Sequence, residues 1–313
     1  LDRPNRINNI NTGDIRIGDN RVINNRPSWA NINQNNLGAI NNRWQGQMNN
    51  LQGWQNNHLD RAGYWGGWGS NVRGNWDHFH DCHDWFNDSW WGNHAHPWGG
   101  WHYGYGFANH AWSDWWMQPT YAAVSSWFTW PTPAPAQVWS EPVYYDYGSG
   151  GNVTYSDNSV YINGQQVSSA ADFAESAAVL ATVPPPASEA EAAAAEWMPL
   201  GTFAVSTNSS DAQPTRTVQL AVDRKGIISG TVFNSETGQA QSVQGQVDKN
   251  TQRVAFRIGE NENVVVETGL YNLTQEEAPA MVHFGTDKTE NWLLVRLEHP
   301  DNSEGAPATT PGG

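Results

Sequence analysis

The sequence predicts an α+β protein whose C-terminal third is an eight-stranded antiparallel β-barrel or sandwich. Short apolar runs with alternating side chains follow one another from Trp197 to His299, separated by turn signals such as "DRKG", "SETG" and "GENEN". A Trp/Gly/His-rich middle precedes them and reads as mostly helical or irregular. The Asn-rich beginning predicts an extended or helical arm, because its apolar residues are too few for a core.

Changes in composition divide the chain into five segments. They are an extended Asn/Arg-rich assembly arm (1–36), a Trp-rich helical or irregular domain (37–139), a β-hairpin with a helix and a Pro/Ala linker (140–196), an antiparallel β domain (197–300) and a disordered tail (301–313). About 100 residues are enough for the β domain to build a core of its own.

Eight strands are expected in the β domain, at about 200–206, 216–222, 227–233, 240–248, 253–258, 263–270, 280–285 and 291–298. Alternation places Val218, Leu220 and Val222 on one face of their strand. The same pattern occurs at Val254, Phe256 and Ile258, and at Leu293, Val295 and Leu297. These positions indicate packing residues, although an eight-stranded barrel can also hold one small molecule.

An apolar stripe predicts one helix from about Ser28 to Ala62. Its residues recur at spacings of three and four: Leu37, Ile40, Trp44, Met48, Leu51 and Trp54. The other faces of this helix are Asn and Gln, so packing must stabilise it. The stripe fits against the body of the same chain or, alternatively, against a neighbouring subunit.

Tryptophan is concentrated in one part of the chain, since seventeen of the nineteen Trp lie between Trp29 and Trp139. Gly and Asn alternate with the rings, which favours a compact aromatic core because Gly lets backbones approach closely. Exposed rings would instead stack on sugar faces. The candidate residues for glycan stacking are Trp90, Trp91, Trp98 and Trp101.

A small hairpin and a helix are expected between the Trp-rich segment and the β domain. Two Tyr/Val-rich runs flank residues 156–158, and the Asn163–Gly164 pair is a hairpin-turn signal. Ser168 or Ser169 is the expected N-cap of the helix that follows. The Pro/Ala linker after it has a helical Ala/Glu portion.

The stretch "DHFHDCHDW" carries candidate ligands for zinc or copper: His78, His80, Cys82, His83 and Asp84. His94, His96 and His102 are further candidates. Their spacing fits no single face of a helix or a strand, and CxxC and HExxH motifs are missing. Surface or Trp-capping histidines are therefore the favoured interpretation, and no cofactor is expected.

Several classes of function are disfavoured by the sequence. GxSxG, P-loop and GxGxxG motifs are missing, so we do not expect an enzyme. A net charge of −15 argues against a nucleic-acid partner. The apolar runs are too short for a membrane span, and the single cysteine excludes an internal disulfide.

Opposite charges are segregated along the chain. Eight Arg and four acidic residues lie in the first 73 positions, whereas residues 74–215 contain fourteen acids and neither Lys nor Arg. An arm that pairs with the next body forms an open chain of subunits. The residues expected to dock the arm on a sheet edge or groove are Ile15, Ile17, Val22 and Ile23 with Arg16, Arg21 and Arg26.

The stretches "FNDSWWGNHAHPWGGWHYGYG", "NVTYSDNSVYINGQQV" and "VETGLYNLTQEEAPAMVHFGTDKTENWLLVRLE" resemble planctomycete cell-surface proteins labelled mu-protocadherin-like. The resemblance implies export to the cell surface and carries no catalytic residues. The opening "LDRPNR" reads as the end of a Pro/Arg repeat, so we expect a signal and a repetitive arm ahead of it.

Two functions fit the sequence. The leading hypothesis is a secreted structural protein that self-assembles into an extracellular filament or surface layer, each arm docking on the next subunit. The alternative is a monomeric surface module that binds polysaccharide through Trp rings or a small ligand in the barrel.

Overall fold

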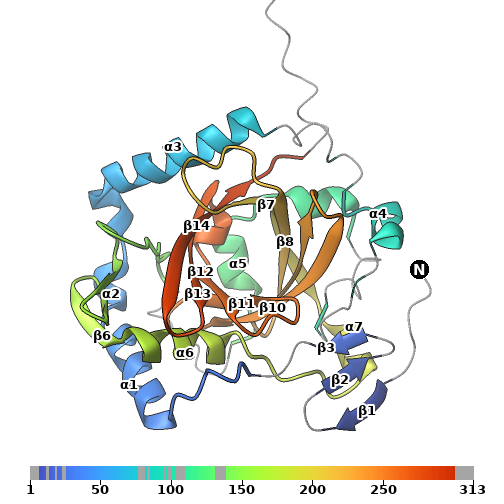
Figure 1. Ribbon diagram of the computed structural model, residues 1–313, viewed down its shortest axis with the longest axis horizontal. Helices are drawn as coiled ribbons and strands as arrows, with labels where there is room; N and C mark the ends of the chain where they lie inside the picture. The colour runs from blue at the N-terminus through green and yellow to red at the C-terminus, as the bar shows by residue number, and fades with distance from the viewer. Residues whose placement is uncertain are drawn as a thin grey trace, which may run out of the picture.

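The computed structural model describes residues 7–11, 14–17, 20–22, 26–76, 82, 85–94, 96, 101–102, 110–130 and 139–299. Its centre is a closed barrel of eight antiparallel strands in sequential order (Figure 1). The strands are β7 (Trp197–Ser206), β8 (Arg216–Asp223), β9 (Ile227–Asn234), β10 (Gln239–Asp248), β11 (Arg253–Ile258), β12 (Val264–Gly269), β13 (Glu277–Phe284) and β14 (Lys288–Arg296). The eight predicted strands are confirmed, and the fold is a barrel rather than a sandwich.

Closure of the barrel comes from pairing of β14 with β7, where Val295 lies opposite Ala204. Alternate residues point inward and build one core, which includes Val218, Leu220, Val254 and Phe256 as predicted. A closed barrel satisfies the backbone of every strand, so it offers no edge to an added strand.

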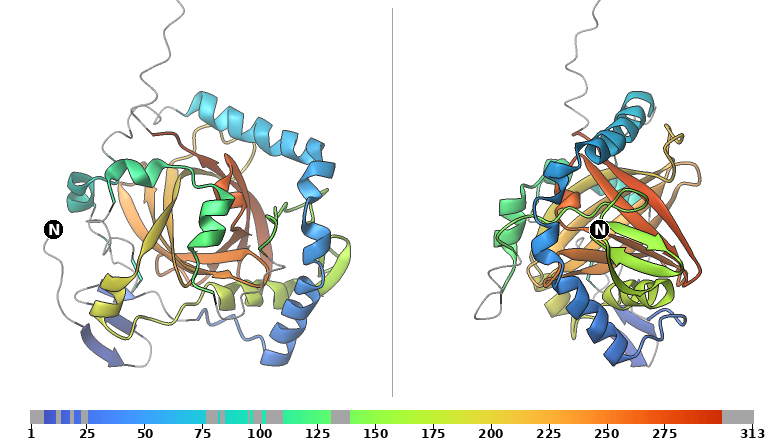
Figure 2. Two further views of the ribbon diagram at one scale, coloured as in Figure 1. Left: turned by 180° about the vertical axis from the view of Figure 1, so that it is seen from behind. Right: turned by 90° about the vertical axis from the view of Figure 1, so that its left-hand side faces the viewer.

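One end of the barrel is covered by α5 (Tyr121–Trp127), which lies across it in the view from behind (Figure 2). Val124 and Phe128 belong to the same core as the inward residues. Around them, Trp127 donates to the carbonyl oxygen of Val222 (3.2 Å) and Trp139 donates to that of Lys249 (2.7 Å). This end is therefore plugged by aromatic side chains.

The outer wall of the barrel is apolar and is covered by the Trp-rich segment. Leu293, Val295 and Leu297 point outward from β14 and its end into a second core. The rings that share this core are Trp65, Trp68, Trp76, Trp90, Trp91, Trp101, Trp115, Trp116 and Trp197. The Trp-rich segment is thus built onto the β domain and does not form a separate core.

The predicted helix over 28–62 is broken in the structure. It is replaced by α1 (Gln34–Gln45), α2 (Met48–Leu51), the 3₁₀ turn η1 (Trp54–Asn57) and the start of α3 (Leu59–Asn75). Gly46 ends α1, and Gly53 adopts a left-handed conformation (φ 69°) that ends the helical path after extended Gln52.

The apolar stripe nevertheless packs against its own chain. Ile40, Trp44, Met48 and Leu51 share a buried core with Tyr145. In Figure 1, α3 runs along one side of the barrel, α1 and α2 along the next, and α6 (Ala170–Leu180) along a third. The short α4 (Asp88–Asn93) lies beside the fourth. The barrel is enclosed on its sides.

Three short strands and two helices fill residues 153–194. The hairpin is extended to a three-stranded meander of β4 (Val153–Ser156), β5 (Ser159–Ile162) and β6 (Gln165–Ser169). Asp157, Asn158 and Asn163 have positive φ in its tight turns. Ser169 caps α6, which confirms one of the two predicted caps, and α7 (Glu189–Ala194) is the helical part of the linker.

Charged groups join the covering segment to the rest of the chain. The guanidinium of Arg61 on α3 binds the fully buried carboxylate of Asp146 through Nε (3.0 Å) and Nη2 (2.7 Å). Trp65 donates to the same carboxylate at 2.9 Å. One of the eight early Arg therefore meets the acidic span within a single chain.

A second charged group is buried between the barrel and α6. Arg253 binds Glu267 at 2.7 Å, His283 lies 3.1 Å from the same oxygen, and the guanidinium stands 4.4 Å from the centre of the Trp44 ring. Burial favours the neutral acid, but Arg253 and His283 outweigh it and lower the pKa of Glu267.

The arm forms a small sheet of β1 (Ile7–Asn11), β2 (Asp14–Ile17) and β3 (Asn20–Val22). Ile15 lies opposite Ile10 and Val22, and Arg16 lies opposite Arg21. The proposed docking residue Ile23 lies outside the described residues. Ala30 and Ile32 are buried in the body, so the body begins near residue 26 and the predicted boundary at 36 is too late.

Replacing Asp146 by Ala should lower the free energy of unfolding by about 2–3 kcal/mol, because Arg61 and Trp65 lose a buried charged acceptor. Arg73→Ala is the matched control on the same helix, since its ion pair with Glu277 is partly exposed and is worth at most about 1 kcal/mol. Urea unfolding followed by circular dichroism measures both. Equal losses in the two variants would show that the buried carboxylate does not hold α3.

Candidate functional site: the open mouth of the barrel

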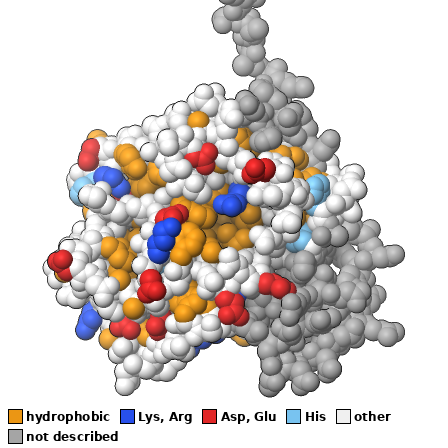
Figure 3. Space-filling view, in the orientation of Figure 1, with side chains coloured by type: hydrophobic (Ala, Val, Ile, Leu, Met, Phe, Trp, Pro, Cys, Tyr) orange, Lys and Arg blue, Asp and Glu red, His pale blue; other side chains and the backbone are white. Residues whose placement is uncertain are grey.

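The barrel has a cavity of about 590 Å³ at the end opposite α5. Its walls come from the residues at that end of the strands, from Val205 on β7 to Trp292 on β14. In Figure 3, hydrophobic side chains gather at the centre of this face, with charged and polar side chains around them. The volume lies within the range of small-molecule sites.

The floor of the cavity is apolar. It consists of Val205, Val232, Ile258, Val264, Phe284 and Trp292. These residues follow from the inward alternation of the strands, and they lie above the packed interior. The Phe284 and Trp292 rings meet at a 6.2 Å centroid distance in an edge-to-face arrangement. The floor therefore offers aromatic and aliphatic contacts together.

The rim of the cavity is polar and mostly uncharged. Its neutral members are Thr207, Asn234, Thr237, Gln239, Gln241 and Asn261. At least one of these amides forms a hydrogen bond within a turn: the Asn234 side chain accepts from the backbone N–H of Glu236 at 3.0 Å. Gln239 and Gln241 are exposed at the start of β10. A polar rim over an apolar floor suits a molecule with one apolar and one polar part.

Two charged residues line the cavity, Arg216 and Glu290. Glu290 accepts hydrogen bonds from Lys288 (2.6 Å) and from the Trp292 indole (2.9 Å). These two bonds lower the pKa of Glu290, the one from Lys288 most, so the carboxylate stays ionised and holds the indole in place. The described lining contains neither a nucleophile–base pair nor paired carboxylates.

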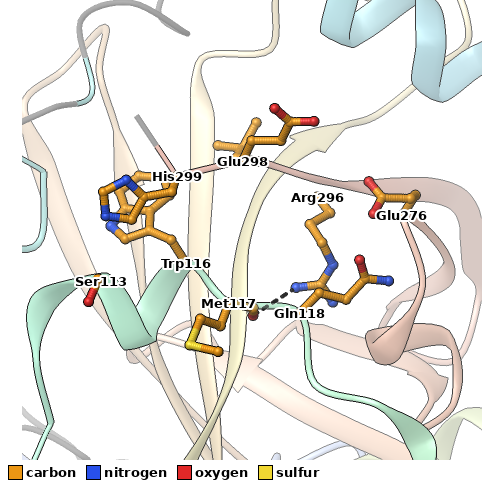
Figure 4. Close-up of a pocket in the computed structure, with 9 residues that line it drawn as sticks. Ser113, Trp116, Met117, Gln118, Glu276, Arg296, Glu298 and His299 are labelled. Atoms are coloured by element: carbon orange, nitrogen blue, oxygen red, sulfur yellow. Dashed lines mark hydrogen bonds between the residues drawn. The ribbon is translucent and has the colours of Figure 1, made fainter. Parts of the chain in front are cut away.

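A second hollow, of about 600 Å³, lies beside the other end of β14 (Figure 4). Arg296 forms part of its wall, but its N–H groups bind the backbone carbonyls of Met117, Leu200, Leu273 and Gln275. Burial lowers the pKa of Arg296 to about 10. This arginine ties four segments together and has few donors left for a ligand, so the hollow is a structural junction.

Most residues of the candidate metal stretch, namely His78, His80, His83 and Asp84, lie outside the described residues. Cys82 is buried in the aromatic core. Within the part of the chain that the structure describes, His, Cys, Asp and Glu side chains form no group of three suited to a metal ion.

The three additional histidines contact neighbouring side chains. His94 stacks on Trp90 at 4.2 Å. His96 and His102 approach the Thr231 hydroxyl at 3.4 and 3.3 Å, and burial lowers the pKa of both. They pack as ring-capping and buried neutral side chains.

The candidate rings for glycan stacking are core residues. Trp90, Trp91 and Trp101 are each at most 5% exposed, so their faces are not open to a sugar. Trp98 lies outside the described residues. The core interpretation of the Trp-rich segment holds for these three rings, because their faces pack against Phe86, His102 and other buried side chains.

The sequence predicted a barrel with room for one small ligand but assigned no residue to the cavity, and Ile258, which lines it, was predicted only as a packing residue. A signal was present in the alternation: Trp292 has the inward parity of Leu294, and Phe284 has that of Val282. Inward residues near the ends of strands line a mouth. The pairing of Glu290 with Lys288 and Trp292 depends on side-chain geometry and has no counterpart in the pattern.

No family model, curated protein or solved structure matches this chain. Among the described helices, none is both long enough and apolar enough to cross a bilayer.

Proposed function

We propose that the protein is a non-enzymatic binding module that holds a small amphipathic molecule in the mouth of its barrel. The observation that supports this most strongly is the shape and lining of the mouth. Its cavity of about 590 Å³ has an apolar floor and a polar rim, and the opposite end of the barrel is plugged. Helices and the Trp rings of the second core cover the side walls, and the mouth opens the barrel interior to solvent.

The location that fits this function is the cell exterior. The resemblance to cell-surface proteins supports export. We therefore place the module at the surface of the cell, where it meets small molecules from outside.

Binding is testable with the neutral fluorophore N-phenyl-1-naphthylamine. We expect a saturable rise in fluorescence with one site per chain, since the floor excludes water from the probe. Gln241→Trp fills the mouth from an exposed rim position and should weaken binding at least tenfold. Thr289→Trp is the matched control, because it adds the same ring to an exposed position outside the cavity lining.

Two results of the fluorescence titration would contradict cavity binding. A wild-type titration without saturation, or a Gln241→Trp variant that binds as tightly as wild type, would show that the probe does not occupy the mouth. A loss of binding in Thr289→Trp as well would show that the ring acts through stability, which a thermal melt of each variant checks.

Self-assembly through the arm is the second candidate function. The specific observation in its favour is that β1 and β3 are each paired on one side only within the described arm, which leaves two backbone edges. The closed barrel has no edge to receive them. In this proposal the partner is the arm of another chain. Arg16 and Arg21 then lie in the assembling sheet.

Removing residues 1–25 should abolish assembly and leave the melting temperature unchanged, because the buried core residues that the structure describes all lie after Arg26. Sedimentation velocity of the full chain and of residues 26–313 compares the two directly. We expect larger species that persist on dilution for the full chain and a monomer for the shortened one. Identical profiles would rule out the arm as the assembling element.

A further inference from the structure

Of the two charged residues that line the barrel mouth, Glu290 is paired and Arg216 is not. Arg216, at the start of β8, is exposed and lines the cavity. Among the described residues, its side chain has neither an ion pair nor a hydrogen bond. The other charged lining residue, Glu290, already accepts from Lys288 and from Trp292. The lining therefore presents one guanidinium whose donors are free.

Acidic residues do lie near the mouth, but outside the cavity. Glu236, Glu260, Glu262 and Asp287 are exposed on the turns between strands, and none of them belongs to the lining. Exposed charges on turns are screened by water and salt. Arg216 differs because it lies beside an apolar floor, where a bound partner would be only partly solvated.

Resting on the binding function proposed above, we infer that the ligand is a small amphipathic carboxylate. Its chain or ring lies on Phe284 and Trp292, and its carboxylate accepts from the Arg216 guanidinium. A guanidinium matches the two oxygens of a carboxylate in a forked geometry, which a neutral alcohol or an amine cannot reproduce. The rim amides supply further donors without adding charge.

A ligand of this kind explains why the mouth combines an apolar floor, a polar rim and one unpaired arginine. The apolar floor binds the body of the molecule but does not distinguish one apolar group from another. The forked cation selects the headgroup and sets its orientation at the rim. Each additional methylene on the floor should tighten binding about fourfold until the cavity is full.

The experiment compares octanoate, octanol and octylammonium as competitors of bound N-phenyl-1-naphthylamine. Wild type should bind octanoate about tenfold more tightly than octanol, and octylammonium should bind most weakly. Arg216→Gln should bind octanoate and octanol equally well, and Arg216→Lys should fall between it and wild type. Arg26→Gln is the matched control, since it removes an exposed arginine outside the lining.

The outcomes separate this inference from the function on which it rests. If wild type binds octanol as tightly as octanoate and Arg216→Gln changes nothing, the carboxylate assignment is overturned while cavity binding stands. If none of the three competitors displaces the probe, or the probe itself does not bind, the proposed function fails with it. Circular dichroism confirms that Arg216→Gln is folded, because an exposed rim position carries little of the core.

Discussion

The rest of the structure depends on covering the outer wall of the barrel. The run from Trp292 to Leu297 is apolar on both faces: Trp292 and Leu294 point inward, whereas Leu293, Val295 and Leu297 point outward. An isolated barrel would expose that outer face to water. The Trp-rich segment covers it, and large rings suit this task because each buries much area with few flexible bonds. The protein is therefore one body built around one barrel.

Indole N–H groups and a few charges fix how the covering segment lies. Trp68 donates to Ser206 at 2.8 Å and Trp76 to the carbonyl of Pro214 at 2.8 Å, both reaching from α3 and its end to the barrel. A side chain at Gly69 would collide with Glu277, so α3 lies close to β13. Apolar contacts alone allow α3 to slide along the barrel. The directional indole hydrogen bonds fix its position. Coverage of the sides and of one end leaves the mouth as the open end of the barrel.

The barrel was predictable because period-two alternation and turn signals are local properties of the sequence. The helical stripe from Leu37 to Trp54 was also visible in the sequence. The helix is interrupted at Gly46 and Gly53, and apolar periodicity takes no account of these glycines. Contacts such as Trp76 with Pro214 join residues far apart in sequence, so composition alone suggested separate domains. The same reason hid the mouth: that Glu290 is paired and Arg216 is not follows from three-dimensional geometry.

The distribution of tryptophan permits one direct measurement of whether cover and barrel form a single unit. Seventeen of nineteen Trp precede residue 140, so their fluorescence reports on the covering segment, whereas far-ultraviolet circular dichroism reports mainly on the strands. Denaturant unfolding of the full chain should give coincident transitions by the two probes, as expected for one cooperative body. A fluorescence transition at clearly lower denaturant, with the strand signal retained, would contradict a shared core.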